Sequence, residues 1–459
     1  MRHSAEKVPH VTIVGAGPAG CLLALLLSAL GCQVDLYDSR SDLRKSQGSK
    51  DRQRSINLAL STRGLTALKR AGVAEKIVQH AVPMHGRCIH PVGGRLQFHP
   101  YGQKHQHLLS VSRRTLCKIL LDECEKRQLI QIHFGHMCTN VDLEDRRVCF
   151  LRTEVIDGEE ADLYVTSDLI VGADGSFSRV RAAMARMDRF EYSQSYVPAA
   201  YKELTMVNAA TSEQSVFPPE FLHIWPRHRF MLIALPNDEK SFTCTLFMDK
   251  SEMDKLSTPA AIKQFFKTNF PDAVDLLPSL VTDFINNPAP SLITVRCNPF
   301  NYIGNAVLVG DAAHAIVPFY GQGCNAAFED CRLLAEAIEG HDWHDMSAVL
   351  SDYARARKPN VDTIADLAIE HYEDMSTKSA RPLAVLRRRL EIVANRLFPR
   401  TFLPLYSMVS FSNIPYRQAV LRAKWQDRKI EQCVMFTGLL FLTASGVAIC
   451  RAALSRPSQ

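Results

Sequence analysis

The chain has 459 residues, of which 46% are hydrophobic and 22% are charged, a balance ordinary for a globular protein. This length is too great for one hydrophobic core, so we expect two or three domains. The formal net charge is only +6, and no basic stretch is interleaved with aromatic side chains, so nucleic-acid binding is not expected.

The cysteines and the N-terminus bear on the cellular compartment. The 13 cysteines form no C-x-x-C pair and no metal-ligand spacing, so no metal site is predicted. The first nine residues are mainly polar and a strand follows directly, a pattern that predicts no secretory signal. Scattered thiols without such a signal are typical of a reducing compartment.

The first pattern along the chain begins with a strand over His10–Val14 and a glycine-rich turn over Gly15–Gly20. A helix over Cys21–Leu30 and a second strand over Gln33–Tyr37 follow. Gly15 permits a tight turn, Gly17 lets the backbone approach a pyrophosphate, and Gly20 lets the helix pack closely on the strand. Asp38 follows Gly15 by 23 residues, which suits a hydrogen bond to an adenosine ribose. The pattern predicts a dinucleotide site for FAD or NAD rather than NADP.

The following segment continues this domain. We expect an exposed loop over 46–54, helices over 62–70 and 114–126, a β-hairpin over 82–101 and a further strand over 168–172. The last strand leads into Asp174-Gly175, an acidic glycine turn that serves as the second anchor of a dinucleotide-binding flavoprotein. No second G-x-G-x-x-G with an acidic partner follows it, so a separate NAD(P)H domain is not predicted.

Residues 190–250 are rich in strand patterns, and three of them predict a meander over 221–227, 230–235 and 241–247. The fold prediction is α/β: a discontinuous Rossmann-like FAD-binding domain, an inserted β-rich substrate domain, a helical C-terminal region and a C-terminal transmembrane helix. The predicted bounds are 9–187 and 298–345 for the two parts of the FAD domain, 188–297 for the insertion, 346–430 for the helical region and 432–450 for the transmembrane helix.

The stretch 310–325 organises the second part of the FAD domain. It follows the apolar strand 306–309 and precedes a helical pattern. Asp311 ends the strand, where its carboxylate can accept a hydrogen bond from a ribitol hydroxyl. Gly321 and Gly323 allow backbone N–H groups to approach an anionic or electron-rich ring at a helix N-terminus.

Residues 432–450 form a 19-residue stretch without a charged side chain. As a helix it would be roughly 28 Å long, close to the ~30 Å hydrocarbon core of a bilayer. Because the stretch is only moderately apolar, a buried terminal helix is the alternative. More basic residues precede it than follow it, which predicts a tail anchor with the main body in the cytosol.

The order of the three motifs, Gly15–Gly20, Asp174-Gly175 and Gly310-Asp311, resembles the flavin-dependent aromatic hydroxylases. The stretches 54–61, 222–227 and 310–331 narrow the resemblance to the branch of that family that hydroxylates L-kynurenine at ring position 3. The resemblance covers about residues 11–416. It implies bound FAD, NADPH and O2 as co-substrates, oxygen transfer through a flavin C4a-hydroperoxide, and a location on the mitochondrial outer membrane.

The resemblance also implies roles for individual positions, and no catalytic side chain is expected because the chemistry is carried by the flavin. The substrate contacts would be Arg87, Tyr101, His371, Tyr406, Leu222, Ile233, Leu235, Thr245 and Phe247. The residues between the substrate ring and the flavin would be Pro318, Phe319 and Gln322. The FAD contacts would be Gly15, Gly17, Ala19, Gly20, Tyr37, Asp38, Arg40, Ala59, Arg113, Cys138, Asp174, Arg179, Asp311, Gly323, Cys324 and Asn325.

The sequence departs from the family at one motif, Asn-Tyr-x-Glu-Met-Arg, where it has His371, Asp374 and Ser376 in place of the asparagine, glutamate and arginine. Because His371 can still donate one hydrogen bond, we expect these changes to affect substrate affinity or preference rather than flavin chemistry. Two alternatives stay open: a flavin hydroxylase of another aromatic substrate, or a flavin-binding membrane protein with a degraded substrate grip. Faster NADPH consumption with a phenol than with kynurenine would favour the first, and failure to bind kynurenine the second.

Overall fold

The structure, a computed structural model, describes residues 8–45, 56–103, 105–153, 162–207, 217–239, 241–376, 398–399 and 401–433, together with 395 and 435. For residues 373–376 it describes the backbone alone. The chain divides into two compact units, residues 1–378 and 379–459.

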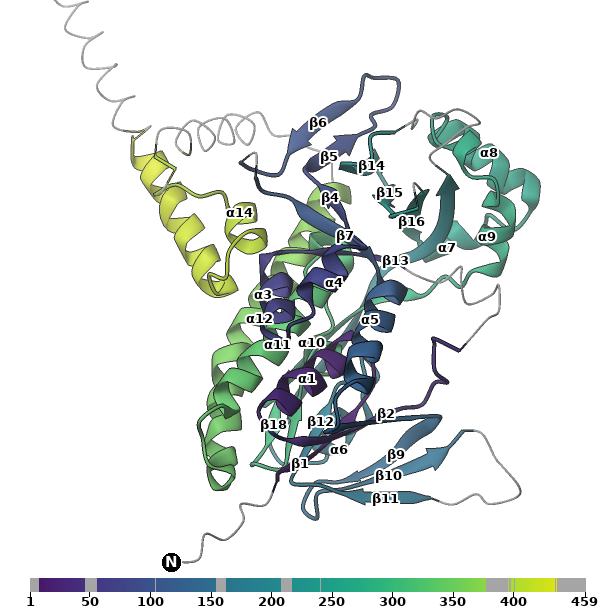
Figure 1. The fold of residues 1–459 in the computed structure, drawn as a ribbon. Coiled ribbons are helices and arrows are strands. Elements are labelled where there is room, and N and C mark those ends of the chain that lie inside the picture. The colour runs from purple at the N-terminus through teal and green to yellow at the C-terminus, as the bar shows by residue number, and fades with distance from the viewer. Residues whose placement is uncertain are drawn as a thin grey trace, which may run out of the picture. The chain divides into compact units, whose positions relative to one another are not determined.

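The first unit contains a six-stranded sheet (Figure 1). Its strands in spatial order are β18 (Asn301–Tyr302), β19 (Ala306–Leu308), β12 (Leu169–Gly172), β1 (His10–Val14), β2 (Gln33–Asp38) and β8 (Ile130–Phe134). All neighbours are parallel except β18 and β19. The chain leaves this sheet after β12 and returns to it at β18, so two distant stretches of sequence share one sheet.

Both faces of this sheet are covered, as expected for parallel strands. On one face α1 (Pro18–Ala29) contacts both α5 (Arg113–Glu125) and α11 (Gly323–Ile338). The alternation of β1 directs Val11 and Ile13 into the core with α1, whereas Val14 packs on the other face with Phe150. That other face carries a three-stranded sheet of β9 (His136–Asp142), β10 (Arg147–Arg152) and β11 (Leu163–Thr166).

A seven-stranded sheet makes up the rest of the unit's β structure, apart from the small sheet of β3 (Asn57–Leu60), β7 (Leu108–Ser112) and β4 (Val82–Met84). Its strands in spatial order are β17 (Ser291–Asn298), β13 (Glu191–Val207), β16 (Ser241–Asp249), β15 (Phe230–Pro236), β14 (Phe221–Arg227), β5 (Gly86–Ile89) and β6 (Gln97–Pro100). We call the face with Arg87 and Phe247 the front face. The opposite back face, with Trp225 and Leu232, packs on α8 (Pro259–Asn269) and α9 (Leu280–Asn286).

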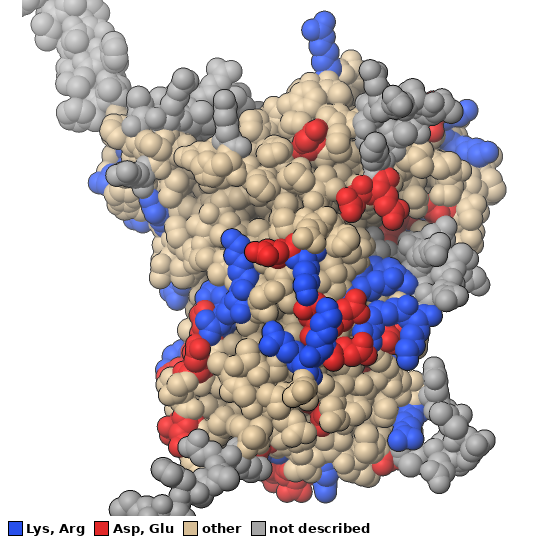
Figure 2. Space-filling view, viewed as in Figure 1, with Lys and Arg blue, Asp and Glu red and all other residues tan. Residues whose placement is uncertain are grey.

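The remaining elements of the first unit are shorter, apart from one long helix. They are α3 (Thr62–Arg70), α4 (Ala74–Val78), α6 (Arg179–Met184), α7 (Lys250–Asp254), α10 (Asp311–His314), α12 (Met346–Ser376) and 3-10 turns over 274–276, 318–320 and 343–345. Figure 2 shows Lys and Arg intermixed with Asp and Glu on one face. That face therefore carries both signs of charge.

The structure differs from the sequence prediction at one hairpin. The predicted hairpin over 82–101 is confirmed only for β5 and β6, because β4 pairs with β7 in another sheet. β5 and β6 join the sheet that contains β13–β17, and Met346 and Leu350 of α12 pack in the core of the first unit. The predicted domain bounds stay a prediction.

The second unit contains α14 (Leu405–Ser410) and a helix over 416–433. The side-chain amide of Gln426 exchanges hydrogen bonds with the backbone N–H and C=O of Leu403, at 2.7 and 2.9 Å, which ties this helix to the preceding loop. Among the residues that the structure describes, every helix is too short or too polar to cross a membrane. The predicted span 432–450 lies outside the described residues except at 432, 433 and 435.

Candidate functional site

A cleft of about 310 Å³ opens at the carboxyl ends of β1, β2 and β12, the edge at which open α/β sheets bind ligands. Its lining includes a set of predicted FAD contacts, namely Gly15, Gly17, Tyr37, Asp38, Arg40, Arg113, Cys138, Asp174 and Arg179. Gly175 of the predicted Asp174-Gly175 turn also lines it, and the sequence analysis missed a further set, from the ends of β1 and β2, from β9 and from the loop after β12: Val14, Ser39, His136, Met137, Ala173 and Phe177.

The glycine turn has the geometry of a phosphate cradle. Gly15 has φ +107°, and a Cβ there would lie 2.4 Å from the backbone oxygen of Ala173, so only glycine fits. A Cβ on Gly20 would lie 1.9 Å from the backbone oxygen of Gly15, which explains how α1 approaches the turn so closely. A Cβ on Gly17, by contrast, would meet no protein atom within 4 Å. The space beside Gly17 is therefore available to a ligand at the start of α1.

Asp38 lies at the end of β2, is buried, and is bound on both oxygens. It accepts hydrogen bonds from the Ala16 N–H at 2.9 Å and from the backbone and guanidinium of Arg40 at 2.7–2.9 Å. Burial tends to raise the pKa of the Asp38 carboxyl, but its bonds with Arg40 outweigh burial and lower that pKa. The Arg40 side chain is 65% exposed. Asp38 is thus engaged by Ala16 and Arg40, and its predicted bond to a ribose hydroxyl stays a prediction.

Asp174 is held by the start of α6. One carboxylate oxygen accepts the Arg179 N–H at 2.6 Å, and desolvation raises the pKa of the carboxyl. The other oxygen, Oδ1, is buried and has no hydrogen-bond partner among the described residues. A buried carboxyl oxygen without a partner is costly, so its position in the cleft lining fits a hydroxyl donor from a ligand.

The remaining predicted FAD contacts gather around the stretch 310–325 rather than in this cleft. A Cβ on Gly310 would lie 3.5 Å from the Ala19 side chain, and one on Gly321 would lie 3.8 Å from the Ala59 side chain. Asp311 opens α10, while Gly323 and Cys324 lie in the first turn of α11. The 310–325 stretch is thus brought beside the N-terminal glycine turn and β3.

The Asn325 side chain makes its hydrogen bonds within the protein. Its amide donates to the backbone oxygens of Ala59 at 2.8 Å and Gly321 at 3.0 Å, and its oxygen accepts the Ser61 N–H at 2.8 Å. The side chain is fully buried. Because both amide hydrogens are used, Asn325 fixes the loop at Gly321, and its predicted direct bond to FAD stays a prediction.

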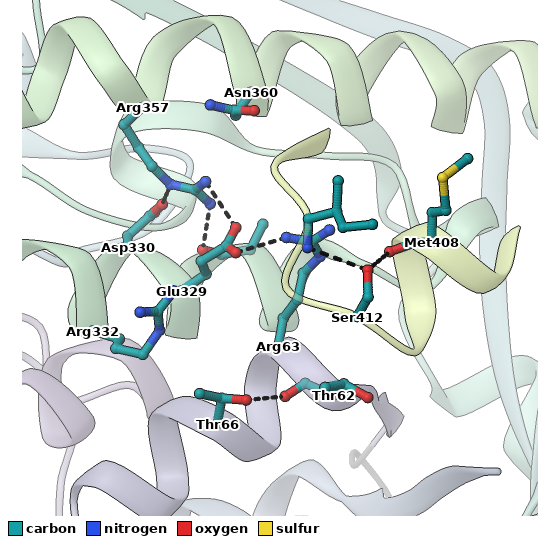
Figure 3. Close-up of polar contacts among 12 residues, drawn as sticks. Thr62, Arg63, Thr66, Glu329, Asp330, Arg332, Arg357, Asn360, Met408 and Ser412 are labelled. Atoms are coloured by element: carbon teal, nitrogen blue, oxygen red, sulfur yellow. Dashed lines mark hydrogen bonds and ion pairs between the residues drawn. The ribbon is translucent and has the colours of Figure 1, made fainter. Parts of the chain in front are cut away.

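A buried ionic network that includes Arg63, Glu329, Asp330 and Arg357 packs against this region (Figure 3). Asp330 on α11 accepts the Gly310 N–H at 2.9 Å, His314 Nε2 at 2.5 Å and Arg357 Nε at 2.5 Å. Glu329 pairs with Arg63 at 2.7 Å and with Arg357 at 2.8 Å. The network joins α3, α10, α11 and α12, and it fixes Gly310, whose φ of +60° sets the direction of the following α10.

The front face of the seven-stranded sheet assembles most of the predicted substrate contacts. Cross-strand pairing sets Arg87 opposite Leu222, Ile233 opposite Thr245, and Met231 opposite Phe247. Residues paired in this way share a face, and Leu235 shares it because it lies two residues after Ile233. The face is apolar, with Arg87 towards the edge strands.

Arg87 and Tyr101 lie together at that edge. The Arg87 guanidinium carbon is 5.6 Å from the centroid of the Tyr101 ring. Tyr101 is buried and Arg87 half-buried. A cation on an apolar face is the arrangement that recognises a carboxylate attached to a hydrophobic body.

Aromatic rings connect the front face to the 310–325 stretch and to α12. The Phe319 ring is 5.1 Å from Phe247 and 4.6 Å from Tyr372. Tyr320 makes an edge contact with His371 at 5.6 Å. Pro318 opens the 3-10 turn that carries Phe319, and Gln322 is buried at the start of α11. Phe319 therefore lies between the sheet and α12, close to the predicted flavin segment.

Three further positions from the sequence prediction are Asp374, Ser376 and Tyr406. The side chains of Asp374 and Ser376 lie outside the described residues. Tyr406 lies on α14 of the second unit, and its ring is 6.2 Å from that of Phe411. Their contacts with a substrate stay predictions.

The missed residues differ in how they could have been found. His136 and Met137 follow β8 after one glycine, and their place in the cleft depends on the sharp return of β9 under the six-stranded sheet. Phe177 is 71% exposed and follows the Asp174-Gly175 turn after one residue, Ser176. An aromatic residue so close in sequence to a nucleotide-binding turn was a usable signal in the sequence.

The cleft, its glycine cradle and the carboxylates at the strand ends fit FAD, and they define a FAD-binding protein. The family described as "FAD binding domain" matches residues 9–368. The tetrameric form of 2-methyl-3-hydroxypyridine-5-carboxylic acid oxygenase shares the fold, with a TM-score of 0.65, 18% identity, and coverage of 83% of this chain and 95% of the other.

Curated relatives narrow the assignment. Kynurenine 3-monooxygenase of Sus scrofa is 40% identical over 442 residues, covering 96% of this chain and 92% of the relative. Kynurenine 3-monooxygenase of Salinispora tropica is 40% identical, with 96% of each chain covered. That of Caenorhabditis elegans is 36% identical, covering 96% and 98%. The chain belongs to the kynurenine 3-monooxygenase family.

Proposed function

We propose that this protein is a FAD-dependent monooxygenase that uses NADPH and O2 to hydroxylate L-kynurenine at the ring 3-position. Full-length similarity to kynurenine 3-monooxygenases supports the activity. The alternative of a different aromatic substrate is not favoured by these relatives. Bound FAD, once reduced by NADPH, supplies the activation of oxygen.

The residues of the chain bind and orient the cofactor and the substrate, and they exclude water from the site. Gly17 and the start of α1 would hold the pyrophosphate of FAD, and Asp38 and Asp174 would accept hydrogen bonds from hydroxyl groups of the cofactor. The front face holds the aromatic ring of the substrate among Leu222, Ile233 and Phe247. Because the aniline nitrogen of the substrate itself enriches the ring carbon ortho to it, no strong protein base is required.

The observation that carries the substrate assignment is the combination of Arg87 with an apolar sheet face. A carboxylate beside such a face is costly unless it is paired, and the Arg87 fork can pair it in a bidentate manner. The test is the product formed from L-kynurenine, NADPH and O2 by the purified holoenzyme. NADPH-dependent formation of 3-hydroxykynurenine supports the proposal, and NADPH consumption that a phenol stimulates more than kynurenine contradicts it.

We further propose that residues 432–450 anchor the protein by its tail in the mitochondrial outer membrane, with the catalytic body facing the cytosol. The support is the uncharged 19-residue stretch with basic residues on both sides. A chain ending at Lys429 is expected to move from the membrane fraction to the soluble fraction with its flavin retained. If it still requires detergent, another surface holds it to the membrane.

A further inference from the structure

The back face of the seven-stranded sheet buries a polar cluster behind the substrate face. Cys88 and His223 are cross-strand partners on β5 and β14, and His90 directly follows β5. By alternation these side chains point away from Arg87. The His90 and His223 side chains are 1% and 0% exposed, although no element of the proposed reaction uses them.

A chain of three short contacts runs through this cluster. Asp272 Oδ2 lies 2.6 Å from His90 Nδ1, His90 Nε2 lies 2.9 Å from His223 Nδ1, and His223 Nε2 lies 2.9 Å from the oxygen of Pro218. Each contact needs one hydrogen atom, and a carbonyl oxygen can only accept. His223 therefore carries its hydrogen on Nε2.

The same count of hydrogen atoms determines which nitrogens of the His90 ring carry hydrogen. Burial lowers the pKa of His223 to about 4, so His223 is neutral and its Nδ1 is a bare acceptor. His90 must then donate from Nε2. Burial tends to raise the pKa of Asp272, but hydrogen bonds from His90 and Trp225 outweigh it and lower that pKa, so Asp272 accepts as a carboxylate. His90 thus carries hydrogen on both ring nitrogens and is a cation.

A metal ion could in principle replace the shared proton, because ligand atoms of Cys88, His90 and His223 all lie within 4.8 Å of one another. Zinc bonds to imidazole nitrogen are about 2.0–2.1 Å long, so a tetrahedral ion would hold the two nitrogens roughly 3.3 Å apart. The observed 2.9 Å is the length of an N–H···N hydrogen bond. The geometry therefore favours a proton.

His90 fastens β5, the strand next to the edge of the sheet. β5 and β6 are the last strands of the sheet, and β5 pairs with β14 over only four residues, 86–89. The His90 ring stacks on Trp225 at 3.9 Å, and Trp225 donates to both oxygens of Asp272 at 3.0 Å. Arg227 donates to the His90 backbone oxygen at 2.9 Å and to that of Asn269 at 2.6 Å. The end of β5 is thereby tied to β14 and to the end of α8.

We propose that His90 is a positioning residue for the substrate: as a cation paired with Asp272, it holds β5 in place so that Arg87 presents its guanidinium to the carboxylate of kynurenine. This inference rests on the proposed function. The titratable and charged groups that face His90 are Asp272 before α9, His223 and Arg227 on β14, and Cys88 on β5.

A side chain without these N–H groups would leave Asp272 and His223 without their donor and loosen β5. The apparent affinity for kynurenine then falls with the fraction of molecules in which Arg87 is in place. The KM for kynurenine is therefore expected to rise in a variant that lacks the His90 N–H groups, whereas kcat at saturating substrate stays constant.

The protonation state is tested directly in the full-length holoenzyme by ¹⁵N NMR of labelled histidine. The His90 signals are identified by their loss in His90→Phe. Both ring nitrogens are expected to show the shifts of protonated imidazole near neutral pH. A neutral His90 tautomer, or one equivalent of zinc in the purified protein, overturns the proposal. This measurement does not depend on activity, so it stands even if kynurenine is not the substrate.

The positioning role is tested by kinetics. His90→Phe keeps a ring to stack on Trp225 but removes both N–H groups, so it should raise the KM for kynurenine about ten-fold, the scale of one lost charged hydrogen bond. FAD content and kcat should stay within about two-fold of the parent. His80→Phe is the matched control, because His80 pairs with Asp238 only at the surface, at 3.7 Å. An unchanged KM, or equal losses of kcat and flavin, overturns the role.

Discussion

Replacing Arg87 with methionine keeps most of the side-chain length and removes the charge that we assign to the substrate carboxylate. Truncating one partner of a buried charge pair costs about 2–5 kcal/mol. Because Arg87 is half-buried and lies at the edge of the sheet, the lower part of this range applies, about 2–3 kcal/mol. This corresponds to a rise in the KM for kynurenine of roughly 30- to 150-fold.

The assay is steady-state formation of 3-hydroxykynurenine by the holoenzyme, with flavin content measured on the same samples. Flavin content should be normal in Arg87→Met, because Arg87 lies on the seven-stranded sheet and does not line the nucleotide cleft. Arg95→Met is the control, since Arg95 is an exposed arginine in the turn of the same hairpin. If Arg87→Met binds kynurenine like the parent, the carboxylate site is elsewhere and the substrate assignment loses its main support.

Three further predictions test the cofactor, the buried network and the substrate helix. Gly17→Val should give folded but colourless protein, because its side chain meets no protein atom and enters the space assigned to the pyrophosphate; normal flavin absorbance would refute this. Interactions with His314 and Arg357 outweigh burial and lower the pKa of Asp330, so its stabilisation is present above the unfolded pKa of about 3.9 and disappears as pH falls through the folded value. Asp330→Asn should therefore lower Tm at pH 7 by roughly 5–10 °C and by less near pH 3, as calorimetry can measure. His371→Asn, which restores the family residue, should leave the KM for kynurenine equal or lower; a large rise would show that His371 makes a specific contact.

Local sequence patterns were sufficient to predict the nucleotide-binding turn. Gly15, Gly17 and Gly20 act within one turn and the start of one helix, and Asp38 follows at a distance fixed by the length of that helix and one strand. Such features depend on backbone conformation and periodicity, which short stretches encode. The meander over 221–247 was predictable for the same reason, since three consecutive strands pair with their sequence neighbours.

Only the tertiary structure decided which distant segments meet. β5 joins β14 although about 130 residues separate them, a pairing that no local pattern specifies. It sets Arg87 on the substrate face and turns Cys88 to the back of the same strand, where His90 meets His223 and Asp272. The fold likewise brings Asn325 to Ala59 and Gly321, to which its amide donates, a role that the sequence did not indicate. The physical reason is that an apolar face fixes which side of a strand is buried, whereas the identity of the neighbouring strand follows from the burial of the whole chain.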